Sequence, residues 1–147
     1  DQDDLWLPRK IEAQMQRLLD DPTLDFVLTE QERFLEPGCD LPSWARPHQV
    51  HTTVGGFEPS AVLMRRATFE RVGPFDPRYV IASDCDWFFR ANDLGLRSAF
   101  VYETLLRRRI HAGNNSRFTE RINAELRRVA LDSIRRKRSM PGAGPQS

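Results

Sequence analysis

Short runs rich in β-branched and aromatic residues alternate along this chain with segments that carry apolar residues at helical spacing. The run DFVLTEQERFLE at residues 25–36 is typical of a strand that ends in a polar turn, and SAVLMRR and RSAFVYE have the same character. Alternation of this kind favours an α/β domain in which helices flank a mixed sheet. We expect strands near residues 25–32, 60–65 and 97–103, and helices near residues 8–20, 84–94 and 117–137.

The first and last of these helices carry apolar stripes that should face the core. Pro8 suits the first turn of a helix because it lacks an N–H group that has no partner there, and Ser116 is a candidate N-cap of the last helix. The stripes that we expect to be buried are Ile11, Met15, Leu18 and Leu19 in the first helix, and Ile122, Leu126, Val129, Ala130 and Ile134 in the last.

Length and charge exclude several classes of protein. A chain of 147 residues has the length of one domain. Its 22 basic and 21 acidic residues nearly cancel, so no field of one sign indicates nucleic acid as a partner. No apolar run approaches the roughly 20 residues that span a bilayer, and the acidic start of the chain is unlike a signal peptide. We therefore expect a cytoplasmic protein.

Three aspartates stand among the first four residues, which is the densest acidic cluster of the chain. Asp1 and Asp3 would share one face of a strand, and an Asp-x-Asp pair supplies the oxygen ligands that Mg²⁺ and Mn²⁺ prefer. The same residues are equally compatible with capping a helix that begins at Pro8. Spacing alone leaves the two interpretations even.

Two further features carry chemistry in the second half of the chain. Asp84 and Asp86 lie at the expected start of a helix, where a carboxylate either caps the helix or serves as a general base. His111 precedes the polar segment AGNNS, and it is either a loop residue or a ligand that completes a metal site. Each of these features taken alone favours the structural role.

The order of three segments is more specific than any one of them: DQDDLWLPRKIE, VLMRRATFERVGPFDPRYVIASDCDWFFRANDLG and LLRRRIHAGNNS. Together they resemble the second half of the family-2 glycosyltransferases, which are inverting enzymes of the GT-A fold. The resemblance runs from Asp1 to about Ser116. It implies a partial, Rossmann-like GT-A domain whose nucleotide-binding half would precede Asp1, so that the chain begins inside a domain.

The resemblance implies donor-side roles for four residues. Asp1 and Asp3 correspond to the Asp-x-Asp motif, in which Asp3 binds a divalent Mg or Mn ion on the nucleotide diphosphate and Asp1 lies near the ribose or the metal. His111 corresponds to a histidine that approaches the diphosphate or the metal. Arg107 is implied to contact the nucleotide-sugar.

It also implies an acceptor side. Asp84 corresponds to the catalytic base, which deprotonates the acceptor hydroxyl as that hydroxyl attacks the anomeric carbon. Asp86 and Trp87 are implied to shape the acceptor site. Gly55 and Gly56 are implied to let the backbone approach a sugar closely.

The function implied is transfer of a single sugar from a nucleotide-diphosphate sugar to a saccharide or lipid-linked acceptor, with inversion. The Gln and Arg-Trp motif of processive synthases is absent near residues 107–111. The alternative is a non-catalytic fragment, or a module that binds a sugar or a partner protein and lacks the nucleotide-binding half. The upstream coding sequence would separate these two readings.

We expect three regions along the chain. Residues 1–116 would form the glycosyltransferase portion, and residues 139–147 a disordered tail. Between them, residues 117–138 would form an amphipathic helix with eight basic and three acidic residues. This helix either contacts the inner face of a membrane peripherally or presents a solvated charged face.

Overall fold

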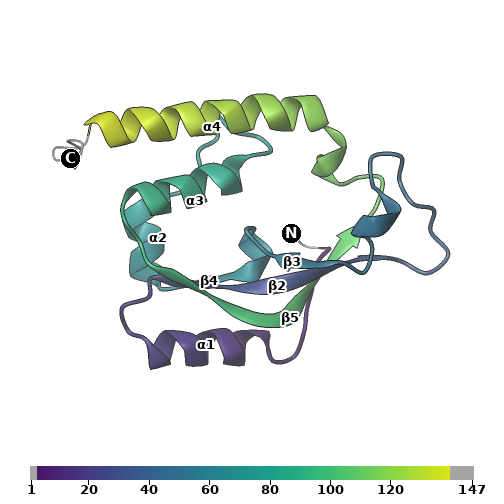
Figure 1. The fold of residues 1–147 in the computed structure, drawn as a ribbon, viewed down its shortest axis with the longest axis horizontal. Coiled ribbons are helices and arrows are strands. Elements are labelled where there is room, and N and C mark those ends of the chain that lie inside the picture. Colours follow the sequence, from purple (N-terminus) through teal and green to yellow (C-terminus); the bar gives the residue numbers. More distant parts are fainter. Residues whose placement is uncertain (1–2, 140–147) are drawn as a thin grey trace.

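Strand β2 (Phe26–Leu35) lies at the centre of an open, mixed sheet of five strands in the computed structural model of this chain (Figure 1). One edge of β2 pairs in parallel with β5 (Ser98–Ile110). The other edge pairs antiparallel with β4 (Val62–Met64) and then with β3 (Thr53–Gly55). The short strand β1 (Leu5–Trp6) lies antiparallel to the end of β5, on the side away from β2.

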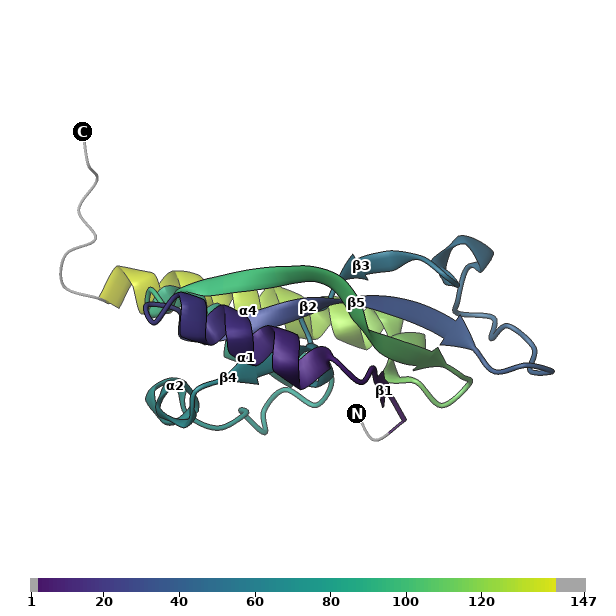
Figure 2. The same ribbon diagram turned by 90° about the horizontal axis from the view of Figure 1, so that it is seen from below.

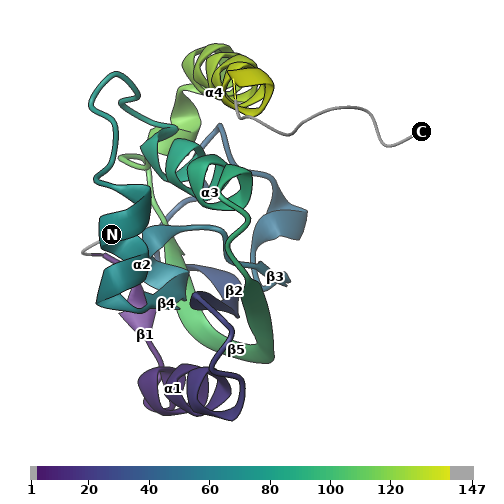
Figure 3. The same ribbon diagram turned by 90° about the vertical axis from the view of Figure 1, so that its left-hand side faces the viewer.

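Helices cover both faces of the sheet (Figures 1 and 2). Helix α1 (Lys10–Asp20) lies on one face, and α2 (Arg66–Val72) and α3 (Ser83–Asp93) lie on the other. Helix α4 (Thr119–Ser139) packs along α3 on its side away from the sheet (Figure 3). The structure describes residues 3–139 and confirms the expected α/β domain with a mixed sheet; no helix in that range is long and apolar enough to cross a membrane.

The first half of β2 is apolar on both faces because helices cover both. Phe26 and Leu28 pack against Trp87 of α3, while Val27 packs against Leu18 of α1 on the opposite face. The rings of Phe26 and Trp87 meet edge to face with their centroids 5.9 Å apart. Burial of each such side chain contributes about 1.5–3 kcal/mol, so these contacts fix both layers of helices onto the sheet.

Helix α1 turns a different face to the sheet from the one that its apolar residues predict. Its buried residues are Lys10, Gln14 and Leu18. Of the expected stripe, only Leu18 is buried. The other three members, Ile11, Met15 and Leu19, are 44%, 48% and 61% exposed.

Hydrogen bonds of the Gln14 side chain explain this rotation of α1. Its amide nitrogen donates to the carbonyl oxygens of Val27 and Ala61 at 2.9 and 2.8 Å, and its amide oxygen accepts from Lys10 Nζ at 2.8 Å. A buried carbonyl left without a partner costs about 1–3 kcal/mol, comparable to what burial of one apolar side chain would contribute. Satisfying two carbonyls together therefore offsets part of what burial of the apolar stripe would contribute, and it holds Gln14 toward the sheet.

Strand β5 is longer than the run 97–103 predicts and continues to Ile110. Its pairing with β2 shifts register twice, on either side of Glu30. Thr29 lies opposite Val101, whereas Glu30 lies opposite Thr104. Thr29 Oγ1 donates to the carbonyl oxygen of Glu103 at 2.7 Å and so satisfies one backbone group that the irregular pairing frees. Irregularities of this kind redirect side chains and are common beside functional sites.

The faces of β2 exchange at this irregularity. Before it, Phe26 and Leu28 face α3. After it, Gln31 and Arg33 line a cavity beside the start of α3, while Phe34 lies under the guanidinium groups of β5 on the other side. Gln31 and Arg33 therefore lie on the same side of the sheet as Phe26 and Leu28. They lie next to the end of β5.

Helix α4 also buries polar residues in place of part of its predicted stripe. Val129 is buried as expected, but Ile134 is 47% exposed, while Glu125 and Ser133 are buried. Ser133 donates a hydrogen bond to Asp93 of α3 at 2.7 Å, so the α3–α4 contact is polar in part. Ser116, the expected cap, instead lies within a short 3₁₀ helix at Asn115–Arg117.

Candidate functional site

A cavity of ≈ 510 Å³ lies among the start of α3, the connection from β3 to β4, the end of β5 and the side of α4. Its volume falls in the range of small-molecule sites, about 300–1,000 Å³. Apolar side chains from Phe57, Ile122 and Leu126 form part of its wall. Its polar lining comes from strands, loop and helix together: Gln31, Arg33, Glu58, Asp84 and Arg108.

Asp84 is the second residue of α3 and is half-buried in the wall of this cavity. Burial raises the pKa of its carboxyl above the ordinary value, and the hydrogen bond from the backbone N–H of Cys85, 2.7 Å from Oδ1, opposes that rise. Within residues 3–139 no cation forms an ion pair with it at hydrogen-bond distance. A cavity-facing carboxylate with a raised pKa is suited to accept a proton.

The segment before Asp84 is held by α4. Glu125 Oε2 accepts the backbone N–H groups of Ile81 and Ala82 at 2.8 and 3.0 Å. Arg121 holds the other oxygen of Glu125 at 3.0 Å. Helix α4 thus fixes the backbone from which Asp84 projects, so the helix belongs to the same structural unit as the cavity.

Glu58 is a second carboxylate of the same cavity. It is 7% exposed, and its Oε2 lies 3.2 Å from Arg108 Nη1. Burial raises the pKa of Glu58; Arg108 opposes this effect, and the negative charges of Asp4 and Asp84 add to it. Because Asp4 and Asp84 both act on Glu58, the N-terminal acidic segment lies close to the cavity.

Asp3 and His111 are in direct contact. His111 Nε2 and Asp3 Oδ2 are 2.7 Å apart, and Arg109 Nε donates to the carbonyl oxygen of Asp3 at 3.0 Å. The register that places Leu5 opposite Arg107 explains how these residues meet. Burial acts to raise the pKa of Asp3, but the hydrogen bond with His111 and the adjacent charges outweigh it, so the pKa of Asp3 lies below its ordinary value.

A smaller cavity of ≈ 250 Å³ adjoins the first one and shares Arg33 and Arg108 with it. It is also lined by Arg109, which contacts Asp3, and by Asn114, whose Oδ1 accepts the backbone N–H of His111 at 2.7 Å. The two cavities therefore extend from the Asp84 carboxylate along the end of β5, and neither Asp3 nor His111 is among the residues that line them.

The donor set at this end fits a hard divalent cation that is shared with a phosphate ligand. A carboxylate and an imidazole leave positions for phosphate oxygens, as Mg²⁺ and Mn²⁺ sites commonly do. Asp4 Oδ2, one residue from Asp3, is buried without a hydrogen-bond partner among the described residues. Residues 3–139 hold no cluster of three or more His, Cys, Asp or Glu side chains that would bind a metal by themselves.

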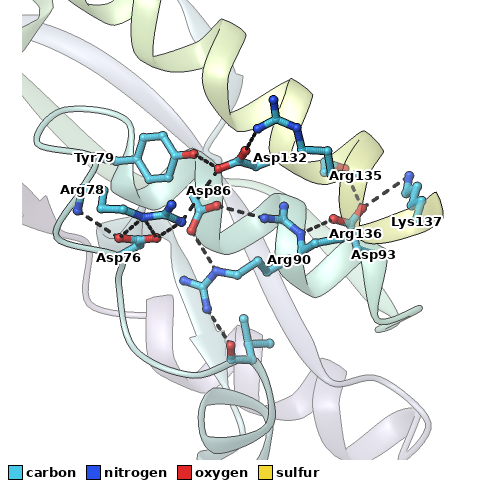
Figure 4. A network of polar contacts seen from close by, with 12 residues as sticks. Asp76, Arg78, Tyr79, Asp86, Arg90, Asp93, Asp132, Arg135, Arg136 and Lys137 are labelled. Carbon is cyan, nitrogen blue, oxygen red and sulfur yellow. Dashed lines mark hydrogen bonds and ion pairs between the residues drawn. The ribbon is translucent and has the colours of Figure 1, made fainter. Parts of the chain in front are cut away.

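Asp86 and Trp87 do not line either cavity. Asp86 is 1% exposed, and its Oδ2 accepts from Arg90 Nε at 2.8 Å while Oδ1 lies 3.6 Å from Arg136 Nη1 (Figure 4). The Trp87 ring lies in the core, and its Nε1 donates to the carbonyl oxygen of Gly73 at 3.1 Å. Their positions point to a role in α3–α4 packing and in the core, and give no support to the acceptor role that the sequence implies.

The two predicted glycines differ in position. Gly55 is exposed and lines the cavity beside Asp84. Gly56 is buried: a Cβ added there would lie 2.5 Å from Ala61 Cβ and 3.0 Å from the carbonyl oxygen of Thr29. The close packing of this backbone against strand β2 explains why residue 56 is a glycine. A contact with a sugar is not needed to explain it.

Arg107 and Asp1 complete the predicted set. Arg107 lies over the Phe34 ring, with its guanidinium carbon 4.3 Å from the ring centroid. Its Nε lies 3.3 Å from Glu32 Oε2. These contacts hold the side chain on the face of the sheet away from the cavity. Asp1 lies outside the described residues, as do residues 140–147 of the expected tail.

Most basic residues of the last helix have partners within the domain. Arg136 and Lys137 approach Asp93 at 2.8 and 3.4 Å, and Arg135 approaches Asp132 at 3.0 Å (Figure 4). Tyr79 donates to the other oxygen of Asp132 at 2.7 Å. This network neutralises much of the positive charge that the sequence offers for contact with a membrane, and it joins α4 to α3 and to the loop before α3.

Four polar residues near the cavity were not predicted from the sequence: Gln31, Arg33, Glu58 and Arg108. Gln31 and Arg33 reach the cavity only because the faces of β2 exchange after Leu28. Arg108 projects between two arginines that face the other way, a consequence of strand alternation in a segment beyond the expected strand. For Glu58, the Gly-Gly pair before it is implied only to let the backbone approach a sugar, and no pattern in the sequence indicates a buried carboxylate.

Comparison with known proteins adds no identification. No protein-family model matches the chain, and no curated protein matches it significantly.

Proposed function

We propose that this protein transfers a single sugar from a nucleoside-diphosphate sugar to an acceptor hydroxyl with inversion, as the acceptor-side portion of a GT-A-type glycosyltransferase domain. The observation that carries the proposal is the position of Asp84. Its carboxylate, whose pKa is raised by burial, lies in the wall of an open cavity. The Asp3–His111 pair lies at the end of β5, the strand that also contributes Arg108 to that cavity.

In this proposal Asp84 accepts the proton of the acceptor hydroxyl while the hydroxyl oxygen bonds to the anomeric carbon. The bond from that carbon to the diphosphate breaks in the same displacement, so the configuration inverts and a nucleoside diphosphate leaves. The raised pKa makes the Asp84 carboxylate a stronger base than an exposed aspartate. The Cys85 N–H fixes one of its oxygens, and Glu125 fixes the backbone before it.

Asp3 and His111 would hold a Mg²⁺ or Mn²⁺ ion, which supplies charge neutralisation on the leaving diphosphate. The low pKa of Asp3 keeps its carboxylate ionised at neutral pH. Arg109 orients the backbone of Asp3 through its carbonyl oxygen. Acceptors would be saccharides, free or lipid-linked, and contact of α4 with a membrane surface would rest on the cations that the intramolecular network leaves free.

Two substitutions test the proposal because they should fail in different ways. Asp84→Asn keeps the shape and the hydrogen bond to Cys85 but cannot accept the proton, so turnover should fall by about 10²- to 10⁴-fold with donor binding unchanged. Asp3→Ala should instead weaken Mn²⁺-dependent donor binding. Asp20→Asn, in an exposed contact with Gln16 on α1, is the matched control.

The measurement is release of nucleoside diphosphate from a panel of nucleotide-sugars with Mn²⁺, together with a donor titration. Near-normal turnover by Asp84→Asn would reject the assignment of the base. Binding of a sugar by the wild-type protein, with no turnover for any donor and acceptor, would favour the non-catalytic module.

A further inference from the structure

Strand β5 has an open edge along its first half. One side of the strand pairs with β2, and on the other side β1 pairs with it only from Leu105 onward. Among residues 3–139 no strand pairs with Ser98–Thr104 on that second side, so this stretch forms a margin of the sheet (Figure 2). The outer strands β3 and β4 have three residues each. The first half of β5 is therefore the longest open edge of the described sheet.

Every second residue of this stretch directs its backbone hydrogen-bonding groups outward. The carbonyl oxygen of Arg97 accepts the backbone N–H of Phe26 at 3.4 Å, so the backbone groups of Arg97 face β2. Alternate residues of a paired strand bond to the same neighbour, so Ala99 and Val101 also bond to β2. The remaining residues direct both their N–H and their carbonyl oxygen to the open edge: Ser98, Phe100 and Tyr102.

The residues of this edge favour pairing with another strand. Edge strands that stay unpaired commonly carry lysine, proline or other charges, whereas residues 98–102 read SAFVY and contain none of these. Tyr102 is 81% exposed, and its ring stacks on Phe100 with the centroids 6.0 Å apart. Phe57, also exposed, contacts Phe100 with a centroid distance of 5.3 Å. The edge therefore combines free backbone groups with an exposed row of aromatic rings.

A second copy of β5 fits this edge in one antiparallel register. Residues whose backbone groups face outward must lie opposite each other for two antiparallel strands to exchange hydrogen bonds. The register centred on Phe100 is the one that uses all of them, because it places Phe100 opposite Phe100 and Ser98 opposite Tyr102 of the second copy. Each of these pairs exchanges both of its backbone hydrogen bonds. A twofold axis at Phe100 therefore satisfies the whole open edge.

The charges that flank the edge are complementary in the same register. Arg97 and Glu103 lie three residues before and after Phe100, so each Arg97 lies opposite Glu103 of the other copy. Both side chains lie on the α1 side of the sheet, because Arg97 is 4.0 Å from Asp21 and Glu103 is 3.6 Å from Arg9 at the two ends of α1. They are 61% and 47% exposed and remain accessible to a second copy. A shift of register in either direction separates these charges.

We propose that two copies of this chain associate by antiparallel pairing of β5 with β5, about a twofold axis at Phe100, and form one continuous sheet. Helix α1 lies under both β2 and β5, since Leu18 packs with Val27 and with Ala99 and Val101. Strands lie about 4.8 Å apart, so the two α1 helices would lie about 10 Å apart, as packed helices do. This inference goes beyond the proposed function and does not depend on it.

The first test is analytical ultracentrifugation of the full chain across the micromolar range, where the wild type should show a monomer–dimer equilibrium. Arg97→Glu and Glu103→Arg should each raise the dissociation constant of the dimer about tenfold or more, because each turns two attractive pairs into repulsive ones. Arg66→Glu makes the same change of charge at an exposed position of α2 and should dimerise as the wild type does. Thermal unfolding of each variant establishes that it is folded.

A mixture of the two charge variants sharpens the test. In a mixed dimer, Glu at position 97 of one copy lies opposite Arg at position 103 of the other, and the native Arg97 lies opposite the native Glu103. Mixing Arg97→Glu with Glu103→Arg should therefore restore association that neither variant shows alone. This rescue depends on the register and does not follow from a loss of stability in either variant.

Amide hydrogen exchange locates the interface. The amides of Ser98, Phe100 and Tyr102 should exchange more slowly as the protein concentration rises, whereas those of Ala99 and Val101, which bond to β2, should not change. A wild-type monomer throughout the micromolar range would leave the edge to a strand of another protein and would overturn self-pairing. So would a dimer whose edge amides exchange at a rate independent of concentration, or a mixture of the two variants that stays monomeric.

Discussion

Lys10 is a buried cation without a carboxylate partner, and this makes a quantitative prediction about stability. It is 0% exposed, and its Nζ donates to Gln14 at 2.8 Å and lies 4.4 Å from the centroid of the Trp6 ring. Burial lowers the pKa of Lys10 from the ordinary 10.5 to about 8. The folded protein therefore binds the proton of this residue less tightly than the unfolded chain does.

The sign of the effect follows from this difference in proton binding. Between about pH 8 and pH 10.5 the Lys10 side chain is protonated more often in the unfolded state, so its contribution to the free energy of unfolding rises with pH through this window. The gap between the two pKa values, at about 1.36 kcal/mol per pH unit, corresponds to about 3 kcal/mol. Below pH 8 the whole penalty is present.

The perturbation is Lys10→Met, which keeps length and apolar volume without the charge. At neutral pH it should stabilise the protein by about 2 kcal/mol, because the gain is reduced by about 1 kcal/mol for the lost hydrogen bond to Gln14. Burial also raises the pKa of Cys85 and of Tyr79 to about 12, which lowers the stability of both proteins alike above about pH 9, so the prediction concerns the difference between them. In urea unfolding across the pH window, the free energy of unfolding of the wild type should rise by about 3 kcal/mol relative to that of Lys10→Met.

Lys137 is the other lysine of the chain and serves as the control. Its side chain is 53% exposed and lies 3.4 Å from Asp93, so Lys137→Met should follow the pH profile of the wild type. Identical pH profiles for the wild type and Lys10→Met would refute the argument that a buried, destabilised cation lies under α1.

Two further substitutions test the packing around the site. Gly56→Ala should destabilise the protein by about 1–3 kcal/mol in urea unfolding, because its Cβ would meet Ala61 and strand β2; unchanged stability would show that the loop is not pressed against β2. Asp93→Ala should cost about 1.5–3 kcal/mol in thermal or urea unfolding, because it removes the hydrogen bond between Arg136 and its closest carboxylate while Asp86 remains nearby; a loss no larger than that in the exposed control Asp20→Ala would mean that the α3–α4 network contributes little.

The fold class and most elements could be predicted because their signals are long and local. Helix α3 forms where a helix near residues 84–94 is expected, with Trp87 and Ala91 buried, and Gly95, with a φ of 69°, follows its end. Strands β2 and β4 lie where their β-branched and aromatic runs place them. Patterns of this kind depend on residues that are close in sequence, so a single chain reveals them.

The buried faces of the helices could not be predicted because they depend on distant polar groups. Gln14 is buried since two backbone carbonyls, from β2 and from the segment before β4, need its amide. Glu125 is buried since the start of α3 needs its carboxylate. Apolar periodicity carries no information about either requirement.

The candidate site was predictable in part, for a similar reason. The acidic start, Asp84 and His111 stand out as residue types, and the structure places Asp3 and His111 in contact. The resemblance implies a place in the acceptor site for Asp86, yet helical geometry turns its side chain toward Arg90 and α4. Gln31 reaches the cavity only through the irregular pairing of β2 with β5, and Glu58 through a loop that a Gly56–Thr29 hydrogen bond holds against β2; the sequence reveals neither.

The account depends most on a single site that includes both the Asp3–His111 pair and Asp84. The direct measurement is paramagnetic broadening of amide signals by Mn²⁺ in the presence of a nucleoside diphosphate. The account predicts strong broadening at Asp3, His111 and the Asp84–Cys85 amides, little at exposed Glu70 on α2, and loss of the broadening at all three sites in Asp3→Ala. Broadening that leaves the Asp84 amide untouched, or that persists in Asp3→Ala, would contradict it.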